Sequence, residues 1–247
     1  MSTCTIYGSL WRRRLIEDVR ERLFTPSPDG PRGVRYGAEV ELLALDAATA
    51  VPVPVTATGE HDLAAMAAAV TPRTRVVLVC TPNNPTGPAV SHAELVAFAE
   101  RVPRDVLVVV DEAYLEFVRG DDPVDGRALL RGRPNVVLLR TFSKVYGLAG
   151  LRVGYGLCGS EELVHAIDQV RQPFFCNVAA QAAAVEALRH QDAVAQRVER
   201  TVMARVEVEE GLRTLGLDPA ESQANFAWFD LASDPEEAAG YEPDVVV

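Results

Sequence analysis

The sequence predicts an α/β fold in which a mainly parallel sheet is covered by helices on both faces. From residue 61 onward, short apolar runs alternate with segments of helical periodicity. Three of these runs, at residues 76–80, 106–110 and 136–139, are almost entirely apolar and rich in valine, as expected of strands buried on both faces. Strands that alternate with helices favour parallel pairing through crossover connections.

The first 59 residues differ in character from the rest of the chain. Residues 15–24 can form an amphipathic helix, and residues 25–33 form a break rich in proline and glycine. Residues 34–45 alternate between apolar and polar side chains, as in a half-buried strand. We expect the Val-Pro-Val-Pro-Val run at 51–55 to end that strand, because proline cannot serve an inner strand. We interpret residues 1–59 as an atypical N-terminal segment.

Residues 60–230 are predicted to form the core of the α/β domain, followed by a short acidic tail at 231–247. Ser91 and Glu94 have the spacing of a capping box, which indicates that a helix begins there. The other predicted elements are helices at 62–70, 160–170 and 178–215, the last interrupted near residue 190, and a strand at 153–158.

The composition excludes several function classes. A formal net charge of −11 provides no basic field, so neither nucleic acid nor an anionic membrane is expected as a partner. The chain opens with no signal peptide and has no apolar run long enough to span a bilayer, which predicts a cytoplasmic protein. The four cysteines lack C-x-x-C spacing and a nearby histidine cluster, so no metal site is expected.

Polar residues follow directly after each of the three apolar runs. The first run leads into T-P-N-N-P-T-G, which contains Asn84. The second leads into D-E-A-Y, with Asp111 and Tyr114, and the third into R-T-F-S-K, with Lys144. Parallel sheets bind ligands outside the carboxyl ends of their strands, so we expect these four side chains to share one site.

Residues 140–156 combine a lysine with groups that bind anions. Lys144 can form a Schiff base with an aldehyde. Arg152, with Ser143 and Thr141, can hold a phosphate by charge-assisted hydrogen bonds. Pyridoxal phosphate (PLP) is an aldehyde cofactor that needs both.

The remaining strand-end residues suit the pyridine ring of the same cofactor. Asp111 can pair with the ring nitrogen, and Asn84 and Tyr114 can donate to the phenolic oxygen. Each residue also has a purely structural interpretation. These are an ordinary turn at 83–87, a helix cap at Asp111, core packing of Tyr114 and Phe117, and a solvated face carrying Glu112 and Glu116. Their joint occurrence at three successive strand ends favours the cofactor.

The segment from about residue 61 to residue 229 resembles the large domain of fold type I PLP-dependent aminotransferases, and most of all the histidinol-phosphate aminotransferase branch. Four motifs carry the resemblance: N-N-P-T-G at 83–87, V-D-E-A-Y-L-E-F at 110–117, R-T-F-S-K-V-Y-G-L-A-G-L-R-V-G-Y at 140–155 and A-N-F at 224–226. Q-P-F-F-C-N at 172–177 is also similar to a family stretch, although it assigns no role to Asn177.

The resemblance implies a PLP-dependent transfer of an amino group between histidinol phosphate, or an aromatic amino acid, and 2-oxoglutarate. It also implies a homodimer with sites at the interface. Lys144 is then the Schiff-base lysine and Asp111 the partner of the pyridine nitrogen. The other implied cofactor contacts are Asn84 and Tyr114 at the phenolate oxygen, and Thr141, Ser143 and Arg152 at the phosphate.

Two parts of the family pattern have no counterpart in the sequence. Upstream of residue 83, only Tyr7-Gly8-Ser9 and Tyr36 approach the expected phosphate loop and ring-stacking aromatic residue. No arginine or lysine follows Arg213 to grip a substrate carboxylate, so we expect the small C-terminal domain to be largely absent. The alternative function is a truncated, catalytically incompetent remnant, for which the dimer is in doubt.

A further alternative concerns G-A-E-V-E-L-L-A-L-D at residues 37–46. It resembles the opening strand of glutamate–cysteine ligase-type carboxylate–amine ligases, which would make Glu39 and Glu41 candidates for nucleotide and metal contacts, and the chain a fusion. An amphipathic edge strand explains the same pattern, and nothing downstream supports ATP chemistry.

Overall fold

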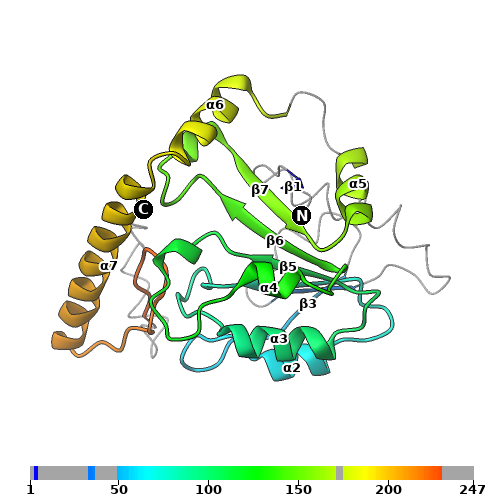
Figure 1. The fold of residues 1–247 in the computed structure, drawn as a ribbon. Helices are drawn as coiled ribbons and strands as arrows, with labels where there is room; N and C mark the ends of the chain where they lie inside the picture. Colours follow the sequence, from blue (N-terminus) through cyan, green and yellow to red (C-terminus); the bar gives the residue numbers. More distant parts are fainter. Residues whose placement is uncertain (1–2, 5–32, 37–48, 171–174, 230–247) are drawn as a thin grey trace.

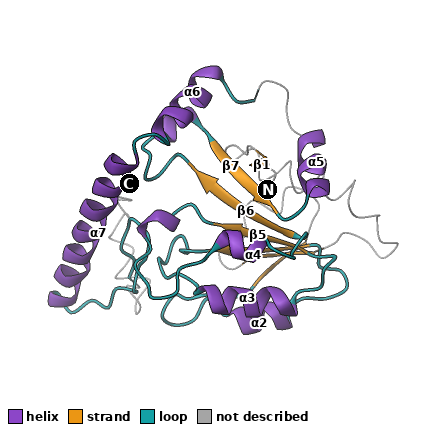
Figure 2. Ribbon diagram, viewed as in Figure 1, coloured by secondary structure: helices purple, strands orange, loops and turns teal. Residues whose placement is uncertain are grey.

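The computed structural model describes residues 3–4, 33–36, 49–170 and 175–229 (Figure 1). Within them a seven-stranded sheet runs in the order β1-β7-β6-β5-β4-β2-β3, with helices packed around it (Figure 2). The strands are β1 Thr3–Cys4, β2 Gly33–Tyr36, β3 Thr49–Pro52, β4 Val76–Cys80, β5 Leu107–Asp111, β6 Val136–Thr141 and β7 Gly154–Cys158. The helices are α2 Leu63–Ala68, α3 His92–Arg101, α4 Gly126–Leu130, α5 Glu161–Val170, α6 Val178–Ala187 and α7 Gln191–Thr214, with 3-10 turns η2 Leu115–Phe117 and η3 Ala149–Leu151.

The sheet is parallel from β3 to β6 and antiparallel where β7 meets β6 and β1. The predicted α/β fold with a mainly parallel sheet is therefore confirmed. The strand at 153–158 was predicted without a direction. The connection between β6 and β7 contains only the short turn η3, and without a crossover helix β7 turns back beside β6.

Part of the N-terminal segment joins this sheet. β2 coincides with the start of the strand predicted at residues 34–45. The proline-rich run does not simply end that strand, as predicted, because its first residues belong to the separate strand β3. β3 lies at the edge of the sheet, where Pro52 leaves no inner hydrogen bond unmade.

Several predictions fall outside the described residues. They are the helix at 15–24, the rest of the strand at 34–45 with Glu39 and Glu41, Tyr7-Gly8-Ser9 and the acidic tail at 231–247. The division of the chain at residues 59 and 230 stays a prediction. None of the described helices combines the length and the apolar character that a bilayer crossing requires.

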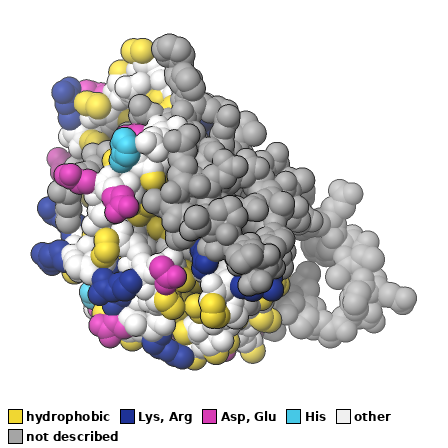
Figure 3. Space-filling view, turned by 90° about the vertical axis from the view of Figure 1, so that its right-hand side faces the viewer, with side chains coloured by type: hydrophobic (Ala, Val, Ile, Leu, Met, Phe, Trp, Pro, Cys, Tyr) yellow, Lys and Arg dark blue, Asp and Glu magenta, His cyan; other side chains and the backbone are white. Residues whose placement is uncertain are grey.

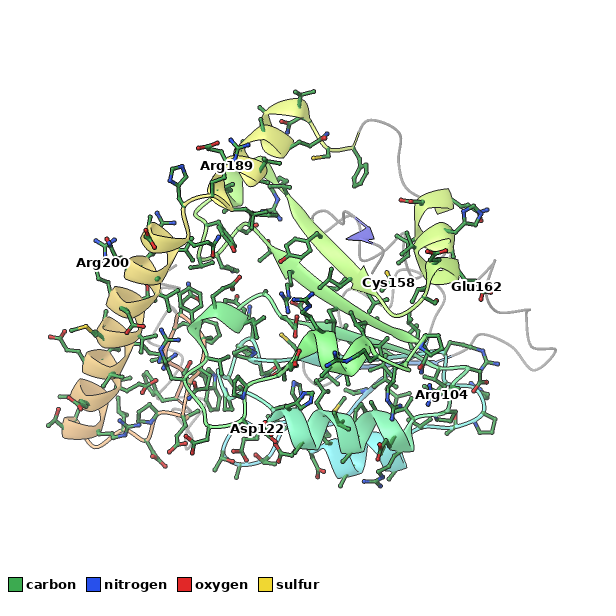
Figure 4. The ribbon with its side chains drawn as sticks, in the orientation of Figure 1. Arg104, Asp122, Cys158, Glu162, Arg189 and Arg200 are labelled. Atoms are coloured by element: carbon green, nitrogen blue, oxygen red, sulfur yellow. The ribbon has the colours of Figure 1, made fainter. Side chains whose placement is uncertain are left out.

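The main core lies between one face of the sheet and the helices α2, α3 and α4 (Figure 1). Alternate residues of β4, β5 and β6 point into it and meet Met66, Leu95 and Phe98. The opposite face of the sheet carries Cys158, the last residue of β7, which is labelled in Figure 4. Its side chain is buried near Asp168 of α5. Helices therefore pack on both faces, which explains why strand residues of either parity are apolar.

Local capping signals begin the helices where the sequence predicts them. The backbone amide of Glu94 donates to Ser91 Oγ at 3.2 Å, and the Ser91 amide donates to Glu94 Oε2 at 3.0 Å, completing the capping box of α3. Asn177, which had no assigned role, caps α6 by accepting from the Ala180 amide at 2.7 Å. The predicted interruption near residue 190 separates α6 from α7.

Candidate active site

The site lies where β4, β5 and β6 end side by side. Cys80 pairs with Asp111 across β4 and β5, and Asp111 pairs with Leu139 across β5 and β6. The loops that follow these strands therefore leave the same edge of the sheet, as predicted.

Figure 3 views the molecule from another side, turned by 90° from Figure 1. On this surface, acidic and basic side chains of the described residues lie interspersed with one another.

Tyr114 connects two of the predicted residues. Its hydroxyl accepts a hydrogen bond from Asn84 Nδ2 at 3.0 Å, and Lys144 Nζ lies 4.9 Å from the centre of its ring. Tyr114 is only 3% exposed, with the ring of Phe226 packed edge-on at 5.3 Å. Asn84, in contrast, is exposed. The structure thus places the Asn84 amide and the Lys144 amine against the same buried tyrosine.

Asp111 is the last residue of β5 and is 6% exposed. One of its oxygens, Oδ1, accepts from the Ala113 amide at 3.1 Å, which orients the carboxylate and starts the turn that leads to Tyr114. The structural interpretation of Asp111 as a helix cap is wrong, because the N-cap of the following 3-10 turn η2 is Tyr114, and no side chain caps that turn. The contact that the Asp111 carboxylate makes instead is this local hydrogen bond to the Ala113 amide. It does not compete with a ligand contact, since a carboxylate has two oxygens and about four acceptor positions.

The three predicted anion-binding residues lie together at the end of β6. The Ser143 amide donates to Thr141 Oγ1 at 3.0 Å, and Arg152 Nη1 lies 3.5 Å from Ser143 Oγ. Arg152 has a left-handed backbone with φ of 54°, and its Nη1 also donates to the Ala149 carbonyl at 2.8 Å. A left-handed backbone costs a non-glycine residue about 1–3 kcal/mol. The surrounding loop must supply this free energy to keep Arg152, with its exposed guanidinium, in that conformation.

The segment at residues 222–226, far along the chain, supports the N-N-P-T-G loop and Tyr114. The Gln223 amide donates to the Gly87 carbonyl at 2.8 Å, and Phe226 supplies the ring against Tyr114. Arg205 of α7, which is 7% exposed, donates from Nη1 to the Ala224 carbonyl at 2.7 Å. The A-N-F motif is the sequence signal for this support, although the sequence gives no indication of what it contacts.

The family model for aminotransferase class I and II matches residues 35–239. This chain belongs to the class I and II aminotransferases. It is 52% identical over 184 residues to an aromatic amino acid aminotransferase of Streptomyces avermitilis, an alignment that covers 74% of this chain and 51% of the relative. The corresponding protein of Streptomyces coelicolor is 50% identical over 187 residues, covering 76% and 52%. The chain thus spans about half the length of the curated relatives that it matches.

Solved aminotransferase structures share the fold. The histidinol-phosphate aminotransferase from Sinorhizobium meliloti, in complex with pyridoxal-5'-phosphate, superposes with a TM-score of 0.84 at 29% identity, over 96% of this chain and 64% of that one. A Thermus thermophilus aspartate aminotransferase mutant superposes with a TM-score of 0.77 at 25% identity, over 93% and 65%. The aminotransferase family resemblance is therefore confirmed. The small domain of the family is not evident in the part of this chain that the structure describes.

The structural interpretation that placed Glu112 on a solvated face is wrong. Glu112 is 1% exposed, and its Oε2 accepts from Arg140 Nε at 2.7 Å. Burial raises the pKa of Glu112, and the Arg140 guanidinium opposes that rise. Arg140 opens the R-T-F-S-K motif, but a charge in a strand-end motif does not reveal by itself that its partner is buried.

Proposed function

We propose that this chain binds PLP on Lys144 and transfers an amino group between an aromatic amino acid and a 2-oxo acid. The observation that carries the proposal is the cluster of Asn84, Tyr114 and Lys144 beside the buried Asp111, at one edge of the sheet. Membership of the class I and II aminotransferases supports both the cofactor and the reaction type.

The chemistry of the described residues fits PLP at both ends of the cofactor. A buried carboxylate, Asp111, suits a protonated ring nitrogen, because a low-dielectric setting strengthens a charge-assisted hydrogen bond. Asn84 and Tyr114 supply the donors for the phenolic oxygen. Thr141, Ser143 and Arg152 supply hydroxyls and a guanidinium for the phosphate.

PLP, when bound, provides an electron sink that stabilises negative charge on the substrate α-carbon. The protein supplies the proton transfers. Lys144 Nζ, which lies over the Tyr114 ring, is the amine that would take and hold the α-proton of the amino substrate. The face of the Tyr114 ring, whose centre is 4.9 Å from Lys144 Nζ, provides a cation–π contact for this amine.

Among amino donors, an aromatic amino acid is better supported than histidinol phosphate. The relatives named as aromatic amino acid aminotransferases are 50–52% identical to this chain, whereas the histidinol-phosphate aminotransferase structure is 29% identical. Histidinol phosphate is the second candidate because that structure superposes over nearly the whole chain. The 2-oxo acid acceptor that we propose is 2-oxoglutarate, and the assembly that we propose is a homodimer.

The test begins with absorbance of the purified chain mixed with PLP, before and after borohydride, beside the variant Lys144→Ala. We expect a visible band that borohydride fixes and that the variant lacks. Folded, soluble wild-type protein without such a band would refute the proposed function.

Turnover is then measured with phenylalanine, tyrosine or histidinol phosphate, with 2-oxoglutarate as acceptor. Faster turnover of the aromatic donors supports the proposal, and faster turnover of histidinol phosphate supports the second candidate. A Lys144-dependent band without turnover of any donor would favour the catalytically incompetent remnant. Light scattering on the same sample tests the homodimer.

A further inference from the structure

A buried ion pair lies directly behind the proposed cofactor residues. Glu112 follows Asp111 in the chain, and Arg140, the penultimate residue of β6, lies four residues before Lys144. The Glu112 side chain is fully buried, and Arg140 is mostly buried, with 22% of its side chain exposed. Their contact, Nε to Oε2 at 2.7 Å, joins the end of β5 to the end of β6.

Further hydrogen bonds connect this pair to the neighbouring strands. The Glu112 amide donates to the Leu139 carbonyl at 2.9 Å, so backbone and side chain hold the same junction. Arg140 stands opposite Tyr155 of β7 in the antiparallel pairing of β6 and β7. Three adjacent strands are therefore joined within one residue of Asp111 and four residues of Lys144.

Helix α4 packs closely against the side chains of Glu112 and Arg140. A Cβ atom at Gly126, the first residue of α4, would lie 3.2 Å from Glu112 Oε1 and 3.3 Å from Arg140 Nη2, and would also collide with Leu138. Helix α4 can approach only because residue 126 has no side chain. The two charged groups consequently have little freedom to reorient.

Stability is a poor explanation for this arrangement. Desolvation of two charges often exceeds what their attraction returns, and apolar replacements of similar size are often neutral or stabilising. Burial raises the pKa of Glu112, so removing its carboxylate from water costs free energy, whereas Glu112 raises the pKa of Arg140 and so favours its charged form. The two shifts oppose each other, which agrees with a small net contribution of the pair to stability. A pair that adds little to stability, yet connects the two strands that carry the proposed cofactor residues, suggests a role in their geometry.

We propose that Glu112 and Arg140 are positioning residues, which set the distance and orientation between the Asp111 carboxylate and the Lys144 amine. The inference rests on the proposed function, because those two groups must meet the same cofactor from adjacent strands. Without the pair, the ends of β5 and β6 keep their backbone ladder, but the loops beyond them relax relative to each other.

The decisive variant is Glu112→Leu with Arg140→Met, which replaces the pair by apolar side chains of similar length. Leu95→Ala, on the face of α3 that packs into the main core, serves as the control for lost stability without a change near the site. Three properties are measured for each protein: the free energy of unfolding in urea, the Kd for PLP by absorbance titration, and the pH midpoint of the Lys144-dependent band.

We expect the double variant to be at least as stable as the wild type but to bind PLP about tenfold or more weakly, with a displaced pH midpoint, as is typical when the partners that orient a ligand-binding residue are lost. Leu95→Ala should lose stability while keeping the wild-type midpoint. Arg140→Lys, which keeps the charge but not the planar fork, should show a smaller change in Kd.

A double variant with wild-type Kd and midpoint would overturn the positioning role. So would equal shifts of the midpoint in the double variant and in Leu95→Ala, because the effect would then be one of stability alone. Failure of the proposed function itself is distinguishable, since it would appear as a missing band in the wild type.

Discussion

Gly87, the last residue of the N-N-P-T-G motif, is the position where a single methyl group should disturb the site most. Its φ is +97°, which side chains rarely tolerate. A Cβ atom there would lie 2.5 Å from Ser222 Oγ, 2.6 Å from Ser222 Cβ and 2.9 Å from Ser222 Cα. The last of these is backbone, so the supporting segment at 222–226 would have to move.

Two costs add in Gly87→Ala. The backbone conformation costs about 1–3 kcal/mol for a residue with a Cβ. Forcing a methyl group into occupied space costs about 1–3 kcal/mol more. The matched control is Gly132→Ala, where φ is +74° but no atom lies within 4 Å of the new Cβ, so only the first cost applies.

Urea denaturation of both variants measures the difference. We expect Gly87→Ala to lose about 1–3 kcal/mol more than Gly132→Ala, out of a total stability of about 5–15 kcal/mol for a typical domain. Adding Ser222→Gly to Gly87→Ala should recover part of the excess, because it removes two of the three colliding atoms. Equal losses in the two alanine variants would refute the close contact between residues 87 and 222.

Four further predictions test the site and its surroundings. Tyr114→Phe should lose about 0.5–1.5 kcal/mol in urea denaturation through its missing bond to Asn84, and an unchanged stability would contradict that bond. Arg152→Asn, which suits the left-handed backbone, should raise the Kd for PLP about tenfold or more, and an unchanged Kd would exclude the phosphate role. Burial raises the pKa of the Cys158 thiol to about 12, so a thiol reagent should label Cys158 at neutral pH only after unfolding, and labelling of the folded protein would contradict its position. Burial raises the pKa of Glu112 above 4.5, so the protonated Glu112 stabilises the folded protein fully below about pH 4.5, and this stabilisation is lost as the pH rises through the folded-state pKa. Over that pH range the wild type should lose stability relative to Glu112→Gln. Parallel pH profiles of the two proteins would contradict the raised pKa.

Sequence patterns were sufficient wherever the deciding interactions are local. The valine-rich runs predicted β4, β5 and β6, because a strand buried on both faces needs apolar residues at every position. The Ser91–Glu94 spacing predicted the start of α3, because both capping bonds lie within four residues. The order of polar motifs also predicted one shared edge, since parallel neighbouring strands end together.

Contacts between distant segments were decided only by the tertiary structure. The burial of Glu112 depends on Arg140 from the next strand and on the absence of a side chain at Gly126. The support of Gly87 by Ser222 and Gln223 joins residues more than a hundred positions apart.

The sequence by itself thus determined the family, the fold class and the candidate residues, because these depend on residue type, spacing and short-range hydrogen bonds. The tertiary structure decided the antiparallel return of β7, the burial of the Glu112–Arg140 pair and the packing of residues 222–226 against the site. Those features arise from close packing between segments whose proximity no local pattern encodes.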